Sequence, residues 1–278
     1  MEFIFYIVAG AAAGLLSGLF GVGGGIIIVS ILTFLFTQAG FPDAHIMHMA
    51  LGTSLATIVF TSLSSARAHH LKSNVDWRIF RQMAPAVVVG TLLGSLVAAQ
   101  LHSNWLKWIF SIFMVAVALQ LLLSPSRKAD TTAVPARSIS PLVNGIAGSL
   151  IGIVSSLVGI GGGTVTVPYL IHYHVQVRRA IGTSAALGLP IAAAGTLGFV
   201  LNGIFAKHSA DIALPAFSAG FVYLPAFAGI AVASMLTAPL GTSLAQRLPV
   251  ATLKRLFALL LIVVGIKMLW GLMLSGLA

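Results

Sequence analysis

The sequence predicts an all-α polytopic integral membrane protein made of two repeats, and three observations lead to this class. Hydrophobic residues make up 58% of the 278 residues and charged residues only 7%, whereas a soluble domain carries about 25% charged residues. Several apolar stretches are long enough to cross a bilayer core of about 30 Å. A run of glycines also occurs twice, which indicates an internal duplication. We expect each repeat to hold a helical hairpin broken at the glycine run and three further transmembrane helices.

The two glycine runs lie inside apolar stretches. Residues 21–25 read Gly-Val-Gly-Gly-Gly, and residues 159–163 read Gly-Ile-Gly-Gly-Gly. Each glycine costs a helix about 0.8–1 kcal/mol relative to alanine. A helix is therefore expected to stop at each run, and a second one to begin near Ile26 or Thr164. Within a membrane such a break is tolerated only where it is buried in protein or lines a wet cavity.

The order of landmarks divides the chain into halves. The first repeat is expected to cover residues 1–123 and the second residues 141–278, joined by a cytoplasmic linker at 124–140 that contains three cations and two prolines. The segment Ile212–Leu224 has no counterpart in the first half. The sequence leaves open whether it spans the membrane, re-enters it or lies at its surface. The expected helices of the first repeat cover residues 3–20, 26–37, 45–66, 83–100 and 105–123.

The distribution of Lys and Arg favours an inverted relation between the repeats. If each glycine break closes a hairpin, the repeats are inverted and both termini are external. The cytoplasmic segments 66–82, 124–140, 172–179 and 246–255 then hold 12 of the 15 cations. If each broken helix crosses once, the repeats are parallel, and the cytoplasmic loops hold 8 cations and the external loops 6. Cytoplasmic loops of membrane proteins carry an excess of Lys and Arg, so we expect the inverted arrangement.

A glycine turn followed by a helix start is a candidate anion site, because the first N–H groups of a helix lack partners and its dipole is positive there. Inverted repeats bring two such ends toward the midplane. Two matched Gly-Thr-Ser triplets, 52–54 and 182–184, add neutral donors that suit a weakly held anion. The alternative is close helix packing for the glycines, and backbone or helix-bridging bonds for the hydroxyls. The candidate substrate-binding residues are Gly23, Gly24, Gly25, Thr53, Ser54, Gly161, Gly162, Gly163, Thr183 and Ser184.

The acidic residues argue against an enzyme and against a cation pump. Each falls in an expected terminus or loop, so no span offers paired carboxylates for acid–base catalysis or an anionic cage for a divalent cation. The chain has no cysteine, which excludes disulfides and thiolate metal sites. We therefore expect no catalytic residue, metal or cofactor, and an intramembrane enzyme is the less favoured alternative. The acids are Glu2, Asp43, Asp76, Asp130 and Asp211.

The composition raises two further partner classes, nucleic acid and a soft metal. The net charge of +10 could suggest nucleic acid, but the cations lie in short loops between apolar stretches, so the lipid bilayer is the expected partner and nucleic acid is not. His45 and His48 with Met47 and Met49, and His172 with His174, could bind a soft metal. They lie at expected segment ends, where such residues commonly face the interface. A transporter or channel for another ion, including such a metal, is the first alternative.

The doubled glycine turn, followed in each half by Gly-Thr-Ser, resembles the TauE/SafE sulfite exporter family, also called the toluene-sulfonate uptake permeases. The resemblance covers essentially the whole chain. One departure is Ser30, where the second copy has Pro168. The resemblance implies a multi-pass secondary transporter that exports sulfite or organosulfonates across the bacterial inner membrane. Its partners would be the small anion and the bilayer, and a homodimer is left open.

Overall fold

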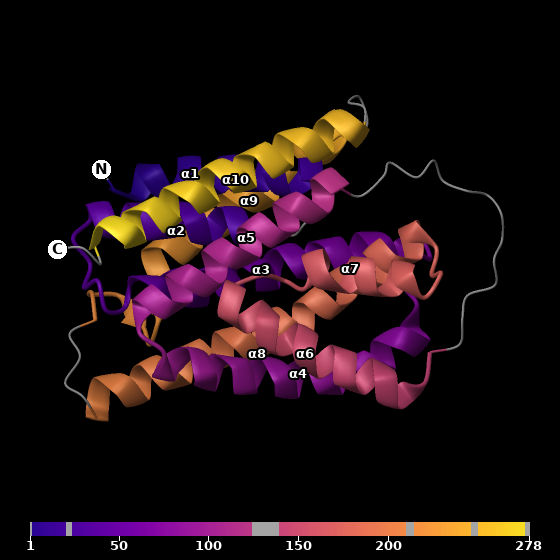
Figure 1. Cartoon of the computed structure of the whole chain (residues 1–278), viewed down its shortest axis with the longest axis horizontal. Coiled ribbons are helices and arrows are strands. Elements are labelled where there is room, and N and C mark those ends of the chain that lie inside the picture. Colours follow the sequence, from indigo (N-terminus) through magenta and orange to yellow (C-terminus); the bar gives the residue numbers. More distant parts are fainter. Residues whose placement is uncertain (1, 21–23, 124–138, 210–213, 246–249, 276–278) are drawn as a thin grey trace.

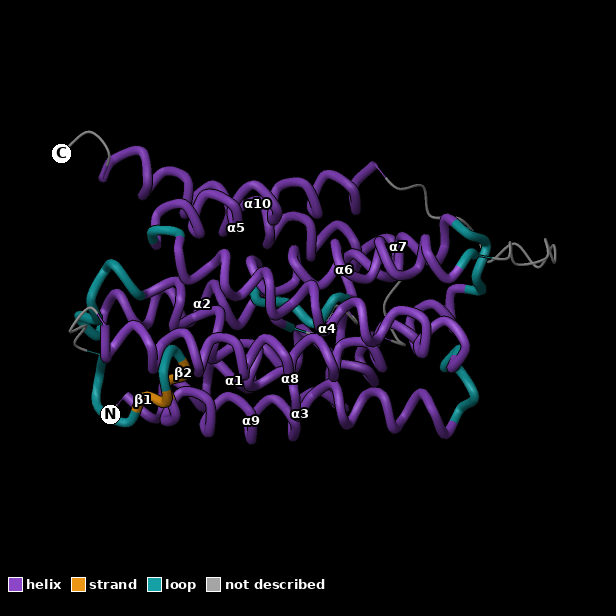
Figure 2. The backbone as a smooth tube through the Cα atoms, turned by 90° about the horizontal axis from the view of Figure 1, so that it is seen from below, coloured by secondary structure: helices purple, strands orange, loops and turns teal. Residues whose placement is uncertain are grey.

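The computed structural model describes residues 2–20, 24–123, 139–209, 214–245 and 250–275 (Figure 1). Helices form almost all of this part of the chain, and they lie roughly along one long axis (Figure 2). In the first half they are α1 (Glu2–Phe20), α2 (Gly25–Gln38), α3 (Ile46–Leu71), α4 (Trp77–Gln100) and α5 (Ser103–Leu123). In the second half they are α6 (Pro141–Val158), α7 (Gly163–His172), α8 (Val177–Ser209), α9 (Leu224–Ala245) and α10 (Val250–Ser275).

Both halves have the same order of elements: a long helix, a short helix after the glycine run, and three long helices. Within the described residues, five helices are long and apolar enough to cross a membrane, namely α3, α4, α5, α6 and α8. The short helices α2 and α7 have 14 and 10 residues, which is too short to cross a core of about 30 Å. The predicted all-α polytopic membrane class is confirmed.

Helix α4 shows how these helices face lipid. Its exposed side includes the large apolar residues Val89, Leu93 and Val97, while Thr91 and Ser95 are completely buried. A soluble helix has the opposite distribution, with its apolar stripe in the core. In a membrane, lipid replaces the core as the apolar medium, and small or polar residues lie between helices, where backbones can approach closely. The outer surface is therefore apolar because it faces lipid.

The helices pack in pairs that cross the two halves. Helix α3 packs on α8 in the antiparallel direction, because Gly52 lies against Phe199 while Gly188 lies against Ser62. Helix α1 packs mainly on α9, helix α4 mainly on α6, and α5 on α10. The beginning of α1 and the end of α10 lie at the same end of the molecule (Figure 1). The α3–α8 pair passes the glycine runs, because Ile58 of α3 lies against Gly25 and Gly161, and Gly188 of α8 lies against Gly161.

Two helix ends extend beyond the sequence prediction. Helix α3 continues to Leu71 and α4 begins at Trp77, so the expected loop at 66–82 shortens to residues 72–76. Hydropathy marks the portion of a helix in lipid, whereas hydrogen bonding decides where the helix ends. Here Asp76 caps α4 by accepting bonds from the N–H groups of Arg78 and Ile79.

The unmatched segment Ile212–Leu224 is not a transmembrane span over its described part. It contains a hairpin of two short strands, β1 (Ser218–Ala219) and β2 (Val222–Tyr223), and the turn uses Gly220 at a φ of 55°. Helix α9 then begins at Leu224. The first residues of the segment and most of the linker at 124–140 lie outside the described residues.

Candidate functional site

The two short helices begin with the same backbone geometry. Gly24 precedes α2 with a φ of 70°, and Gly162 precedes α7 with a φ of 79°. This left-handed conformation is open to glycine at little cost and disfavours side chains with a Cβ. Neither helix start receives a capping side-chain hydrogen bond. Both helices therefore present their first N–H groups and positive dipole end without a cap. The predicted site residue Gly23 lies outside the described residues.

The two glycine runs contact each other at the centre of the molecule. A Cβ on Gly25 would lie 2.5 Å from the carbonyl oxygen of Gly159 and 2.9 Å from the Cα of Ile160. Ile58 of α3 lies against both Gly25 and Gly161. From this contact α2 and α7 run toward opposite ends of the molecule (Figure 1). Of the predicted site residues, the structure thus places Gly25 against the beginning of the second run, and Ile58 lies between Gly25 and Gly161.

Ser54 joins the two runs directly. Its hydroxyl lies 3.0 Å from the carbonyl oxygen of Gly159 and 3.4 Å from that of Gly25, so it donates to the backbone of the breaks. Its counterpart Ser184 is also buried, and its hydroxyl has no hydrogen-bond partner among the described residues. The two matched serines therefore differ: Ser54 holds the breaks together, whereas Ser184 keeps a free donor.

The matched threonines lie at connections between the halves. The Thr53 hydroxyl accepts a hydrogen bond of 3.0 Å from the N–H of Tyr223, immediately before α9. The Thr183 hydroxyl accepts one of 2.8 Å from the N–H of Asp76, immediately before α4. Because α3 and α8 are antiparallel, the two threonines lie roughly 20 Å apart along the pair, at a rise of 1.5 Å per residue. The structure does not bring them together, and both hydroxyls already bind backbone.

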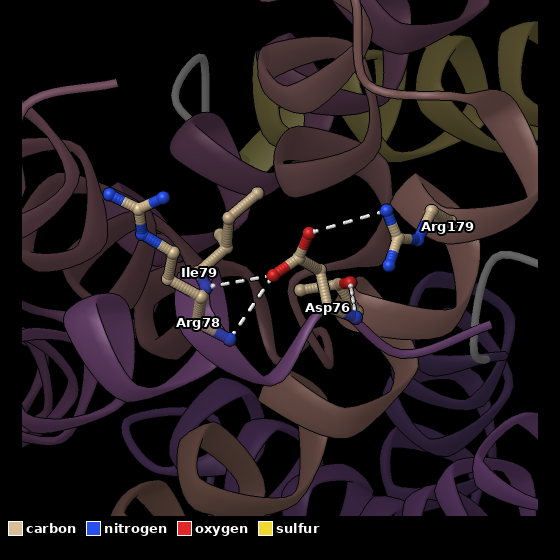
Figure 3. A network of polar contacts seen from close by, with 5 residues as sticks. Asp76, Arg78, Ile79 and Arg179 are labelled. Atoms are coloured by element: carbon tan, nitrogen blue, oxygen red, sulfur yellow. Dashed lines mark hydrogen bonds and ion pairs between the residues drawn. The ribbon is translucent and has the colours of Figure 1, made fainter. Parts of the chain in front are cut away.

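Asp76, which the sequence predicts only to lie in a loop, makes several contacts that join the two halves. Its carboxylate accepts hydrogen bonds of 3.1 and 3.2 Å from the N–H groups of Arg78 and Ile79, and it lies 3.9 Å from the guanidinium of Arg179 (Figure 3). Together with the bond to Thr183, these contacts fasten the α3–α4 turn to the start of α8. An acidic residue just before an amphipathic helix is a recognised capping signal, so the sequence contained this information.

One of the histidines predicted at segment ends, His48, binds the protein's own backbone. The Nε2 of His48 lies 3.0 Å from the carbonyl oxygen of Ala98 and 3.1 Å from that of Leu101. Both partners are acceptors, so this nitrogen carries the proton. Burial lowers the pKa of the neighbouring His45, which favours its neutral form. Among the described residues, no three His, Asp or Glu side chains cluster in a way that could hold a metal ion.

The fold and the central contact define a polytopic membrane protein with two interrupted helices at its core, the arrangement of many secondary transporters. The family described as sulfite exporter TauE/SafE matches residues 6–268. The chain therefore belongs to the TauE/SafE family, and it is a membrane transporter rather than an enzyme.

Curated relatives agree with this assignment. A probable membrane transporter protein of Haemophilus influenzae is 39% identical over 94% of this chain and 96% of its own length. One of Methanocaldococcus jannaschii is 29% identical over 95% of this chain and 94% of its own length. The probable membrane transporter protein YunE of Bacillus subtilis is 30% identical over 73% of this chain and 80% of its own length. No solved structure matches the chain significantly.

Proposed function

We propose that this protein is a secondary transporter that exports small sulfur-containing anions, such as sulfite or organosulfonates, across the bacterial inner membrane. The observation that carries the proposal is the contact of the start of α2 with the turn that precedes α7, both helices beginning without a side-chain cap. Free N–H groups and the positive ends of two dipoles favour an anion at this place. The sulfur in the proposal is supported by the family description.

The packing directions support two inverted halves. The matched helices α3 and α8 are antiparallel. The pair α1–α9 also has its counterpart in the pair α6–α4, as expected when the two halves exchange places. In transporters of this kind, one half rocks against the other around a fixed central site. We propose this motion here, with the glycine runs as the fixed site and the halves divided at the segment 124–140.

The positions of the acids support transport without a proton relay. Among the described residues, Asp43 and Asp76 lie in connections between helices, and Asp76 is engaged in a cap and an ion pair. A buried carboxylate is the usual proton carrier in a coupled transporter. The membrane potential favours exit of an anion by about 2.3 kcal/mol per charge per 100 mV. Export therefore needs no further coupling, whereas uptake of the same anion would oppose this force.

Thermal stability of the purified protein tests the substrate class. A ligand that binds only the folded state stabilises it by RT ln(1 + [L]/Kd). Sulfite and ethanesulfonate should raise the melting temperature more than chloride at equal ionic strength. Gly162→Ala should reduce this effect, because residue 162 has a left-handed backbone and its new Cβ would collide with Ile191. Gly145→Ala serves as the control, because a Cβ at residue 145 would meet no heavy atom within 4 Å. Equal stabilisation by chloride would contradict the proposed substrate class.

Flux in proteoliposomes tests the driving force. At a fixed gradient of ethanesulfonate, which stays ionised at all working pH values, a potential set by potassium and valinomycin should change the rate. A pH gradient at zero potential should leave the rate unchanged. Strong acceleration by the pH gradient would show proton coupling and refute potential-driven export.

A further inference from the structure

Two threonines at the start of α7 behave unlike most others in this protein. Threonine hydroxyls inside helices usually donate to the carbonyl one turn earlier. Thr33, Thr57 and Thr196 do so, with distances of 2.8, 3.0 and 2.7 Å. Thr164 and Thr166, in contrast, have buried hydroxyls without a hydrogen-bond partner among the described residues, as does Thr91 in the middle of α4. Because a buried hydroxyl that makes no bond is costly, these two positions point to a ligand that accepts hydrogen bonds.

The Thr166 hydroxyl is directed toward the helix start. Side chains on a helix lean toward its N-terminus, and the Oγ1 of Thr166 lies 3.4 Å from the place that a Cβ on Gly162 would occupy. Thr166 is completely buried, and Gly162 is the uncapped left-handed residue before α7. The hydroxyl therefore lies beside the uncapped first turn of α7. The N–H of Val165 is already bound to the Gly162 carbonyl, so the first-turn donors left without an intrahelical partner are the N–H groups of Gly163 and Thr164.

The first half lacks these donors. Residues 25–29 read Gly-Ile-Ile-Ile-Val, whereas residues 163–167 read Gly-Thr-Val-Thr-Val. The positions that match Thr164 and Thr166 are Ile26 and Ile28, both buried in the main hydrophobic core. The start of α2 can thus offer only backbone N–H groups, so the two halves of the central contact differ chemically although their backbones agree.

We propose that substrate binding is asymmetric: the oxyanion lies at the start of α7, where the hydroxyls of Thr164 and Thr166 donate to its oxygen atoms. The start of α2 contributes only backbone and dipole. This assignment rests on the proposed function and deepens it, because it names which half recognises the sulfur-bound oxygens. A sulfite or sulfonate group offers three oxygen acceptors, enough for two hydroxyls and the first-turn N–H groups together.

Isosteric variants test the assignment by two readouts, the ligand-free melting temperature and the affinity for sulfite and ethanesulfonate obtained from melting-temperature titrations. Thr166→Val should weaken both affinities about ten- to a hundredfold, the effect of losing a hydrogen bond to a charged group. It should leave the ligand-free melting temperature equal or higher, because the lost hydroxyl has no partner in the protein. Thr164→Val should act in the same direction, and Thr166→Ser, which keeps the hydroxyl, should bind as the unchanged protein does.

The matched control is Thr33→Val in α2, where the hydroxyl donates to the carbonyl of Val29. This change should leave the affinity unchanged and the melting temperature equal or lower. Unaltered affinity in both Thr166→Val and Thr164→Val would overturn the assignment while leaving the transporter proposal intact. A loss of binding in Thr166→Ser as large as in Thr166→Val would also overturn it, since it would show a packing role. If no sulfur anion stabilises the unchanged protein, the proposed function itself fails.

Discussion

Replacing Gly25 with alanine tests the central contact most directly. Gly25 is the first residue of α2, and a Cβ there would lie 2.5 Å from the carbonyl oxygen of Gly159 and 2.9 Å from the Cα of Ile160. Both atoms belong to the backbone of the second glycine run. They cannot turn away as the end of a flexible side chain can, so the two runs would have to separate.

The expected cost follows from these contacts. Overpacking of a well-packed core costs about 1–3 kcal/mol, while replacing glycine with alanine inside a helix returns up to about 1 kcal/mol. We expect Gly25→Ala to lower the free energy of unfolding by about 2 kcal/mol, the middle of the overpacking range, and by about 1 kcal/mol less if the helix gains its full propensity. Separation of the runs should also lengthen the hydrogen bond from Ser54 to Gly159 and weaken anion binding.

The matched control is Gly145→Ala in α6, where a Cβ would meet no heavy atom within 4 Å. This change should stabilise the protein by up to about 1 kcal/mol, since only helix propensity changes. Thermal melting in detergent, with and without sulfite, distinguishes the two variants, because 1 kcal/mol shifts the melting temperature of a chain this size by about 2–4 °C. If Gly25→Ala melts at or above the unchanged protein and binds sulfite equally well, the two glycine runs are not in the contact described above.

Further predictions concern the Asp76 cap and the orientation of the chain in the membrane. Asp76→Ala should cost about 1 kcal/mol in unfolding free energy through loss of the cap, whereas Asp76→Asn keeps an acceptor and should cost only a few tenths. Arg179→Ala should cost less than about 0.5 kcal/mol, because the 3.9 Å ion pair is partly exposed; a larger loss than in Asp76→Ala would refute this ranking. The chain has no native cysteine, so single exposed cysteines report which side of the membrane each end of the molecule faces. Cysteines at one end should react only from the cytoplasm, and those at the other end only from outside. If the two members of the cytoplasmic pair react from opposite sides, the inverted arrangement is excluded. The cytoplasmic pair is Ser73→Cys and Arg178→Cys, and the external pair is Gln38→Cys and Asn104→Cys.

Local chemistry let the sequence alone predict the class of protein and the places where helices break. Low charge and long apolar stretches require a membrane, because only satisfied helices are stable there. The glycine runs stop α6 after Val158 and start α2 at Gly25 and α7 at Gly163, since left-handed backbone at Gly24 and Gly162 depends on the residue type itself. Helix ends outside lipid were predicted less well, because a cap such as Asp76 leaves no trace in hydropathy.

Only the tertiary structure decided what the matched polar residues do. Ser54 donates to a carbonyl 105 residues away, Thr183 accepts from an N–H 107 residues away, and Thr53 from one 170 residues away. A hydroxyl can donate to a ligand, donate to backbone or accept from backbone, and its residue type does not distinguish these roles. The residue type alone likewise does not show that the hydroxyls of Thr164 and Thr166 lack a partner in the protein. Only the surrounding packing shows this. The repeat made the two halves similar in backbone, and distant contacts made them different in chemistry.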